Sequence, residues 1–120
     1  MPDQSVEVTF DPNAEPQFTF VPNTVTMTKA GKIVLHRRPQ DAPWKFKGGS
    51  VKMDEWGQFT PSVHGNGSLL HLDDKFTDRE MTSHSYMVRV EFELGSGSRD
   101  YDSPDHVIVN DPGARLEEES

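Results

Sequence analysis

The stretch YMVRVEFEL, residues 86–94, decides the fold class of this chain. Its apolar side chains occupy every second position and alternate with Met87 and charged residues. A period of two gives a β-strand one apolar face and one polar face. We therefore expect residues 86–94 to form a central strand, with Val88, Val90 and Phe92 in the core.

Shorter apolar stretches, some alternating in the same way and some continuous, flank this one and are separated by turns rich in glycine, proline and asparagine. They are residues 6–10, 18–20, 25–27, 33–35, 51–53, 59–63, 69–72 and 107–109. Short strands with turn signals about every ten residues are typical of a sandwich or small barrel. The sequence thus predicts an all-β fold, a single immunoglobulin-like or cupredoxin-like antiparallel β-sandwich of about seven to nine strands.

The chain of 120 residues fits one domain, which we place at residues 1–113, because a second core would leave each core too small. The polar and acidic residues 114–120 predict a disordered tail. His64-Gly65-Asn66-Gly67 predicts a tight hairpin, since Asn-Gly tolerates positive φ angles. Residues 73–82 alone have helical potential, and we expect one helical turn there at most.

Composition excludes several kinds of chemistry. The chain has no cysteine, which removes disulfides, thiolate metal sites and a cysteine nucleophile together. No apolar run approaches the roughly 20 residues that cross a bilayer. The first ten residues also lack the basic and apolar regions of a signal peptide. We therefore expect a cytoplasmic protein with no membrane partner.

The formal net charge of −8 arises entirely in the second half of the chain. Residues 1–60 carry seven basic and seven acidic side chains, whereas residues 61–120 carry five and thirteen. An acidic protein is a poor partner for duplex nucleic acid. The basic segment between Lys29 and Lys52 could attract the acidic half of a second copy, so we expect a homo-oligomer.

The opening strands carry a first resemblance. Phe20-x-Pro22-x-x-Val25-Thr26, followed by Gly31 and Ile33-Val34-Leu35, resembles the opening strands of cupredoxins. This resemblance implies a sandwich architecture and not copper, because a blue-copper centre needs a cysteine thiolate.

A second resemblance covers most of the chain. Asp41-Ala42-Pro43-Trp44-x-Phe46 and the segment from Tyr101 to Pro112, together with Phe18-x-Phe20-x-Pro22, look like the small bacterial DP-EP family. The resemblance implies a compact sandwich domain. The family has no established activity, so the resemblance supplies no catalytic residues.

Two groups of side chains are candidate metal sites. Asp100, Asp102 and Asp105 gather hard oxygen ligands that suit calcium, although a solvated turn explains the same residues. His64 and His71 could approach one another across the predicted hairpin and bind a divalent ion, and ordinary surface histidines are the alternative.

Aromatic and basic side chains in the middle of the chain form a candidate ligand site. Trp44, Phe46 and Trp56, with Arg37 and Arg38 nearby, could make an aromatic platform for a sugar, nucleotide or peptide. The alternative is that the rings complete the core beneath a loop.

Catalytic motifs are lacking in the sequence: there is no nucleophile elbow, phosphate loop or dinucleotide fingerprint. We therefore expect a non-enzymatic binding or assembly module. The alternative is a metal-dependent or carboxylate-based hydrolase that uses the aspartates near residues 100–111 and a histidine such as His106.

Overall fold

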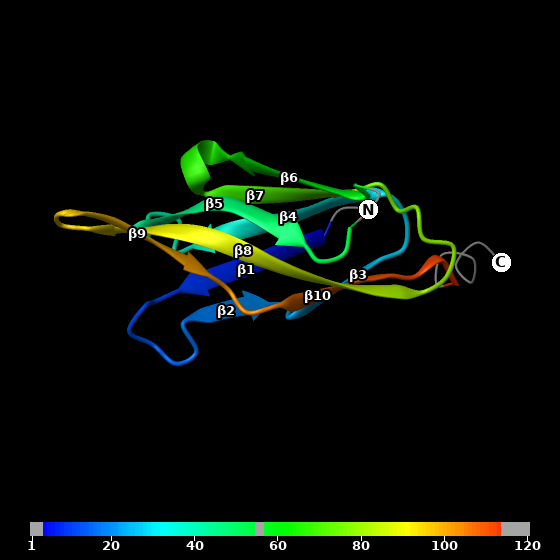
Figure 1. The fold of residues 1–120 in the computed structure, drawn as a ribbon, viewed down its shortest axis with the longest axis horizontal. Helices are drawn as coiled ribbons and strands as arrows, with labels where there is room; N and C mark the ends of the chain where they lie inside the picture. The colour runs from blue at the N-terminus through cyan, green and yellow to red at the C-terminus, as the bar shows by residue number, and fades with distance from the viewer. Residues whose placement is uncertain (1–3, 55–56, 114–120) are drawn as a thin grey trace.

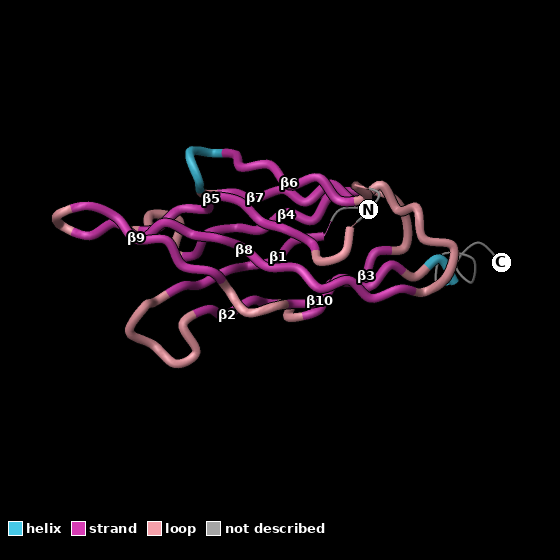
Figure 2. The backbone as a smooth tube through the Cα atoms, viewed as in Figure 1, coloured by secondary structure: helices cyan, strands magenta, loops and turns pink. Residues whose placement is uncertain are grey.

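The computed structural model describes residues 4–54 and 57–113, which form two β-sheets stacked as two layers (Figure 1, Figure 2). Trp56 and the predicted tail at residues 114–120 lie outside the described residues. The elements are β1 (Gln4–Phe10), β2 (Phe18–Val21), β3 (Thr24–Met27), β4 (Gly31–Arg38), β5 (Trp44–Val51), β6 (Phe59–His64), the short turn η1 (Gly65–Gly67), β7 (Leu69–Asp74), β8 (Thr82–Leu94), β9 (Gly97–Asp102) and β10 (His106–Asn110). The all-β prediction is confirmed.

Both sheets contribute their inward faces to one core. The first sheet has the order β2-β1-β4-β7-β6, and the second has the order β3-β10-β8-β5, with β9 also paired to β8. Alternate residues of the strands point inward, as a period of two requires. The largest fully buried side chains are Trp44, Tyr86, Phe20, Met27, Ile33, Leu35, Leu70, Leu72 and Ile108.

β8 is the central strand of the second sheet, as predicted. Tyr86, Val88 and Val90 have no exposed surface, whereas Phe92 is only partly buried against the core. β5 pairs with one edge of β8. The opposite edge is shared, because β10 pairs with the first part of β8 and β9 pairs with the last part.

Ser103 joins β9 to β10 along that shared edge. Its backbone N–H donates to the Val88 carbonyl at 2.9 Å, and its hydroxyl oxygen accepts the Val88 N–H at 2.9 Å. The hydroxyl therefore replaces a backbone acceptor where the chain steps from one strand to the next. Because buried backbone groups need partners, this contact keeps the edge of β8 satisfied along its length.

The expectation of purely antiparallel sheets is wrong, because β1 pairs in parallel with β4 and β3 pairs in parallel with β10. The chain leaves the first sheet between β2 and β3 and returns to it at β4, which places β4 beside β1. Alternating hydrophobicity identifies a strand, but it does not identify the neighbour of that strand.

Ten strands are described, more than the seven to nine expected. The irregular pattern of residues 39–49 predicts a loop with a short strand at most, but β5 forms there, with a register shift between Phe46 and Gly48 that interrupts its period. Residues 95–98 predict a flexible connection, but β9 begins within them at Gly97, and only Tyr101 in β9 is partly buried. Backbone pairing with β8 forms both strands where the apolar pattern is weak.

The connections before and after β7 bear on two predictions. The hairpin at residues 64–67 is confirmed, with positive φ angles of 61° at Gly65, 56° at Asn66 and 94° at Gly67. The limit of one helical turn at residues 73–82 is not exceeded, because β7 continues to Asp74 and β8 begins at Thr82, with no helix in the residues between them.

Replacement of Val90 by aspartate should unfold the domain. The carboxylate would enter the core without a partner, at a cost of several kcal/mol against a total stability of about 5–15 kcal/mol. Ser83 lies on the same strand and is exposed, so Ser83→Asp should change stability by about 0.5 kcal/mol at most. Thermal unfolding followed by circular dichroism measures both variants. An unchanged Tm in Val90→Asp would contradict the placement of β8 in the core.

Candidate functional site

The predicted aromatic platform is buried in the core. Trp44 and Phe46 are 1% and 2% exposed, and their rings meet edge to face at 5.1 Å between centroids. Trp56 lies outside the described residues. Trp44 and Phe46 therefore complete the core, and Trp44 offers no open ring face to a ligand.

The two arginines predicted beside that platform have structural contacts. Arg37 donates from Nε to the Gln40 carbonyl and from Nη1 to the Trp44 carbonyl, each at 2.8 Å. These hydrogen bonds stabilise the connection between β4 and β5. Arg38 lies 3.5 Å from a Glu7 carboxylate oxygen on the neighbouring strand β1.

The three aspartates of the predicted calcium site face three different cations. Asp102 accepts hydrogen bonds from Arg89 at 2.7 and 3.1 Å, which lower the pKa of Asp102. Asp100 lies 3.9 Å from Lys47, and Asp105 pairs with Lys52. The three carboxylates are thus held by separate partners.

Across residues 4–54 and 57–113, no group of three or more histidine, aspartate or glutamate side chains is arranged to hold a metal ion. The predicted histidine pair is nevertheless brought together. The rings of His64 and His71 stack with centroids 4.1 Å apart, and Ser62 Oγ lies 2.9 Å from His64 Nε2.

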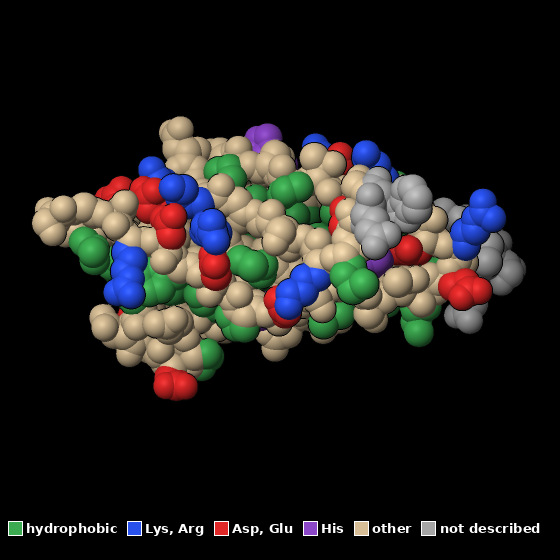
Figure 3. Space-filling view, in the orientation of Figure 1, with side chains coloured by type: hydrophobic (Ala, Val, Ile, Leu, Met, Phe, Trp, Pro, Cys, Tyr) green, Lys and Arg blue, Asp and Glu red, His purple; other side chains and the backbone are tan. Residues whose placement is uncertain are grey.

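Basic and acidic segments that are distant in the sequence pair within one molecule. Lys47 lies 3.1 Å from Glu91, Lys45 lies 3.8 Å from Glu91, and Lys52 pairs with Asp105. Figure 3 shows lysine, arginine and acidic side chains side by side over this part of the surface. Three lysines of the basic segment therefore pair with acidic residues of the same chain, because β5 lies beside β8 and near β9.

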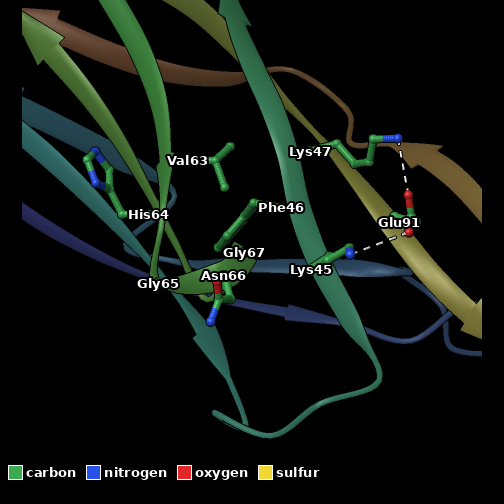
Figure 4. A pocket seen from close by; sticks show the side chains of 9 residues that line it. All are labelled: Lys45, Phe46, Lys47, Val63, His64, Gly65, Asn66, Gly67 and Glu91. Carbon is green, nitrogen blue, oxygen red and sulfur yellow. Dashed lines mark ion pairs between the residues drawn. The ribbon is translucent and has the colours of Figure 1, made fainter.

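An open groove of about 680 Å³ runs between β5 and β6 and ends at the β6–β7 hairpin (Figure 4). β5 and β6 are edge strands of different sheets, so the groove follows the seam where one side of the two-layer fold opens. Its lining residues are Lys45, Phe46, Lys47, Val63, His64, Gly65, Asn66, Gly67 and Glu91.

Gly67 closes one end of this groove by a close approach to β5. A Cβ atom at Gly67 would lie 2.4 Å from the Cβ of Lys45, and its φ angle of 94° also disfavours other residues. The hairpin can therefore rest against β5 only with glycine at this position. Phe46 lies beneath the groove, and Val63 on its wall is 40% exposed.

Among the residues that line the groove, positive charge exceeds negative charge, and Asp100 beyond the lining lies 3.9 Å from Lys47. Lys45 and Lys47 both face the single carboxylate of Glu91 (Figure 4). The hydrogen bond between Lys47 and Glu91 raises the pKa of Lys47 and lowers the pKa of Glu91, so these two groups are charged at neutral pH. The groove can therefore attract an anionic group.

The sequence singled out only part of this groove. Phe46, His64 and the basic segment that contains Lys45 and Lys47 were candidate features of the sequence, whereas Val63 and Glu91 were not. Glu91 belongs to the groove because it lies opposite Lys45 in the pairing of β5 with β8. That register, which the sequence alone does not supply, was the missing signal.

His106, the histidine of the alternative hydrolase hypothesis, packs against the core. Its ring stacks on Phe20 with centroids 3.7 Å apart, and its Nδ1 lies 3.0 Å from the Pro104 carbonyl oxygen. Burial lowers the pKa of His106. The ring of His106 thus packs on the core, and its Nδ1 faces a carbonyl of the connection between β9 and β10.

Neither a scan against protein-family models nor a search of curated proteins finds a match to this chain. Among the described residues, no helix has the length and apolar character needed to cross a membrane.

His106 should make stability depend on pH. Its pKa in the folded chain lies below the unfolded value of about 6.5, so protonation favours the unfolded chain. Its stabilising contribution is complete above that value and is lost as the pH falls through the lowered pKa. His106→Phe keeps a ring against Phe20 and does not titrate. The drop in Tm between pH 7.5 and 5.5 should therefore be smaller in the variant, and equal drops would contradict this role.

Proposed function

We propose that this protein is a non-enzymatic binding module whose groove between β5 and β6 binds extended, acidic peptide segments. The observation that carries the proposal is the position of Lys45 and Lys47 in an open groove at the edges of both sheets. The electrostatic attraction supplies the preference for acidic side chains.

The shape of the groove supports an extended occupant. An edge strand carries backbone N–H and C=O groups that an added peptide strand can pair with. Every residue of β6 from Thr60 to His64 is exposed, so a peptide can approach this strand. Pro61 removes one donor from the edge, and we therefore expect a short ladder.

The surroundings of His64 support binding over catalysis. His64 lies within hydrogen-bonding distance of Ser62, but its ring stacks on another imidazole. A serine nucleophile with a histidine base commonly has a carboxylate that orients the base. The two residues are exposed on an edge strand, where water has free access.

The fold type and the family belong to the same proposal. Two mixed sheets around one core are compatible with an immunoglobulin-like sandwich. The resemblance to the DP-EP family, which has no established activity, is likewise compatible with a binding module. We propose both assignments on these grounds.

A titration with the peptide acetyl-(Glu-Thr)3-amide tests the groove. Backbone amide signals in two-dimensional NMR spectra of the full chain should shift and saturate at residues 45–47 and 65–67. The double variant Lys45→Gln, Lys47→Gln removes two surface charges and should weaken binding about tenfold. The analogue acetyl-(Lys-Thr)3-amide should cause no saturable shift.

The matched control changes the same charge at the other end of the molecule. Lys29 and Lys75 are exposed, and the pairing of Gly31 with Asp74 puts them near the end opposite the hairpin. The double variant Lys29→Gln, Lys75→Gln should bind the peptide as the unmodified chain does. Wild-type affinity in the Lys45, Lys47 variant, or no saturable shift in the unmodified chain, would refute the proposal.

A further inference from the structure

A buried polar cluster lies at the end of the core opposite the hairpin. Its members are Gln58 just before β6, Asp74 at the end of β7, Asp78 in the following loop, His84 near the start of β8 and Asn110 at the end of β10. This end lies to the right in Figure 1. Asp74 and Asn110 have no exposed surface, and Gln58 is 5% exposed.

Three oxygen atoms of this cluster converge on one nitrogen. Asn110 Nδ2 lies 2.9 Å from Gln58 Oε1, 3.2 Å from Asp74 Oδ1 and 3.0 Å from Asp78 Oδ2. An amide nitrogen carries only two protons, so it cannot donate fully to three acceptors. The three acceptor oxygens therefore outnumber the two N–H protons that Asn110 can donate.

Two further oxygens of the cluster are buried without a partner, namely Asp74 Oδ2 and Asn110 Oδ1. The backbone N–H groups of Phe76 and Thr77 reach only Asp74 Oδ1 and Gln58 Oε1, each at 2.9 Å. Buried polar atoms are almost always satisfied, and an unsatisfied one indicates a bound water, ion or proton.

The charges of the cluster are also unbalanced. Asp78 pairs with His84 at 2.7 Å, which leaves Asp74 without a cation in direct contact among its described partners. Burial raises the pKa of Asp74. A buried carboxylate without a positive partner costs several kcal/mol, so a cation or a proton would relieve this cost.

We propose that this cluster binds a hard divalent cation of the calcium class, held by the carboxylates of Asp74 and Asp78 and by the amide oxygens of Asn110 and Gln58. Calcium takes six to eight oxygen ligands from carboxylates, amides, backbone carbonyls and water. Three oxygens converge on Asn110 Nδ2, and Asn110 Oδ1 and Asp74 Oδ2 are unpartnered. On cation binding the Asn110 amide would turn over, so that its oxygen replaces Nδ2 at the point of convergence and completes the donor set.

The small number of carboxylates sets the expected affinity. Two aspartates serve the site, and calcium affinity follows the charge count of the ligands. We therefore expect binding in the millimolar range. Asp78, whose side chain is 18% exposed, gives the cluster contact with solvent.

Thermal unfolding of the full chain at pH 7.5 tests the site. Addition of 10 mM calcium chloride, compared with a chelator and sodium chloride at equal ionic strength, should raise Tm by about 3–5 °C through binding to the folded state. Asp74→Asn and Asp78→Asn should each abolish this rise. Asp74→Asn preserves side-chain shape and removes a buried charge, so it should fold.

The double variant Asp100→Asn, Asp102→Asn is the matched control, because it removes two acidic charges from β9. It should keep the full rise in Tm. Three outcomes would overturn the proposal: no rise in the unmodified chain, a full rise in both Asp74→Asn and Asp78→Asn, or loss of the rise only in the β9 variant. The first outcome would mean that a proton on Asp74 or a bound water satisfies the cluster.

Discussion

Backbone pairing along both edges of β8 is the constraint on which the rest of the structure depends. This strand has 13 residues, and three other strands form their ladders on it. Because β10 and β9 share one edge, the chain must step between them, and the Ser103 hydroxyl satisfies the backbone at that step. The opposite edge takes β5, which then becomes the edge of the second sheet.

The position of β5 explains both the surface charges and the groove. Its lysines lie beside Glu91 of β8 and near Asp100 of β9, so the uneven charge of the sequence becomes a set of ion pairs between neighbouring strands. Its other side faces β6 across the open seam, where the hairpin approaches through Gly67. One end of the fold thus carries an exposed basic groove, and the other carries a buried acidic cluster.

Much of the fold could be predicted from local pattern, because a buried strand face leaves a period of two and a tight turn needs particular residues. Val88, Val90 and the Asn66-Gly67 hairpin are examples. β5 and β9 could not be predicted in full, because a bulge in β5 and the exposed faces of β9 remove the period of two. The candidate sites depend on register: Glu91 meets Lys45, and Asn110 meets Asp74, only through pairings of strands distant in sequence.

The same register separates the residues that sequence proximity had grouped. Asp100, Asp102 and Asp105 lie close in the chain, yet each faces a different cation.

Native-state amide hydrogen exchange tests the central place of β8 most directly. The amides of residues 86–90 should exchange only through global unfolding and far more slowly than those of residues 97–100 in the β9 hairpin. Exchange of residues 86–90 as fast as that of the hairpin would contradict the central role of β8.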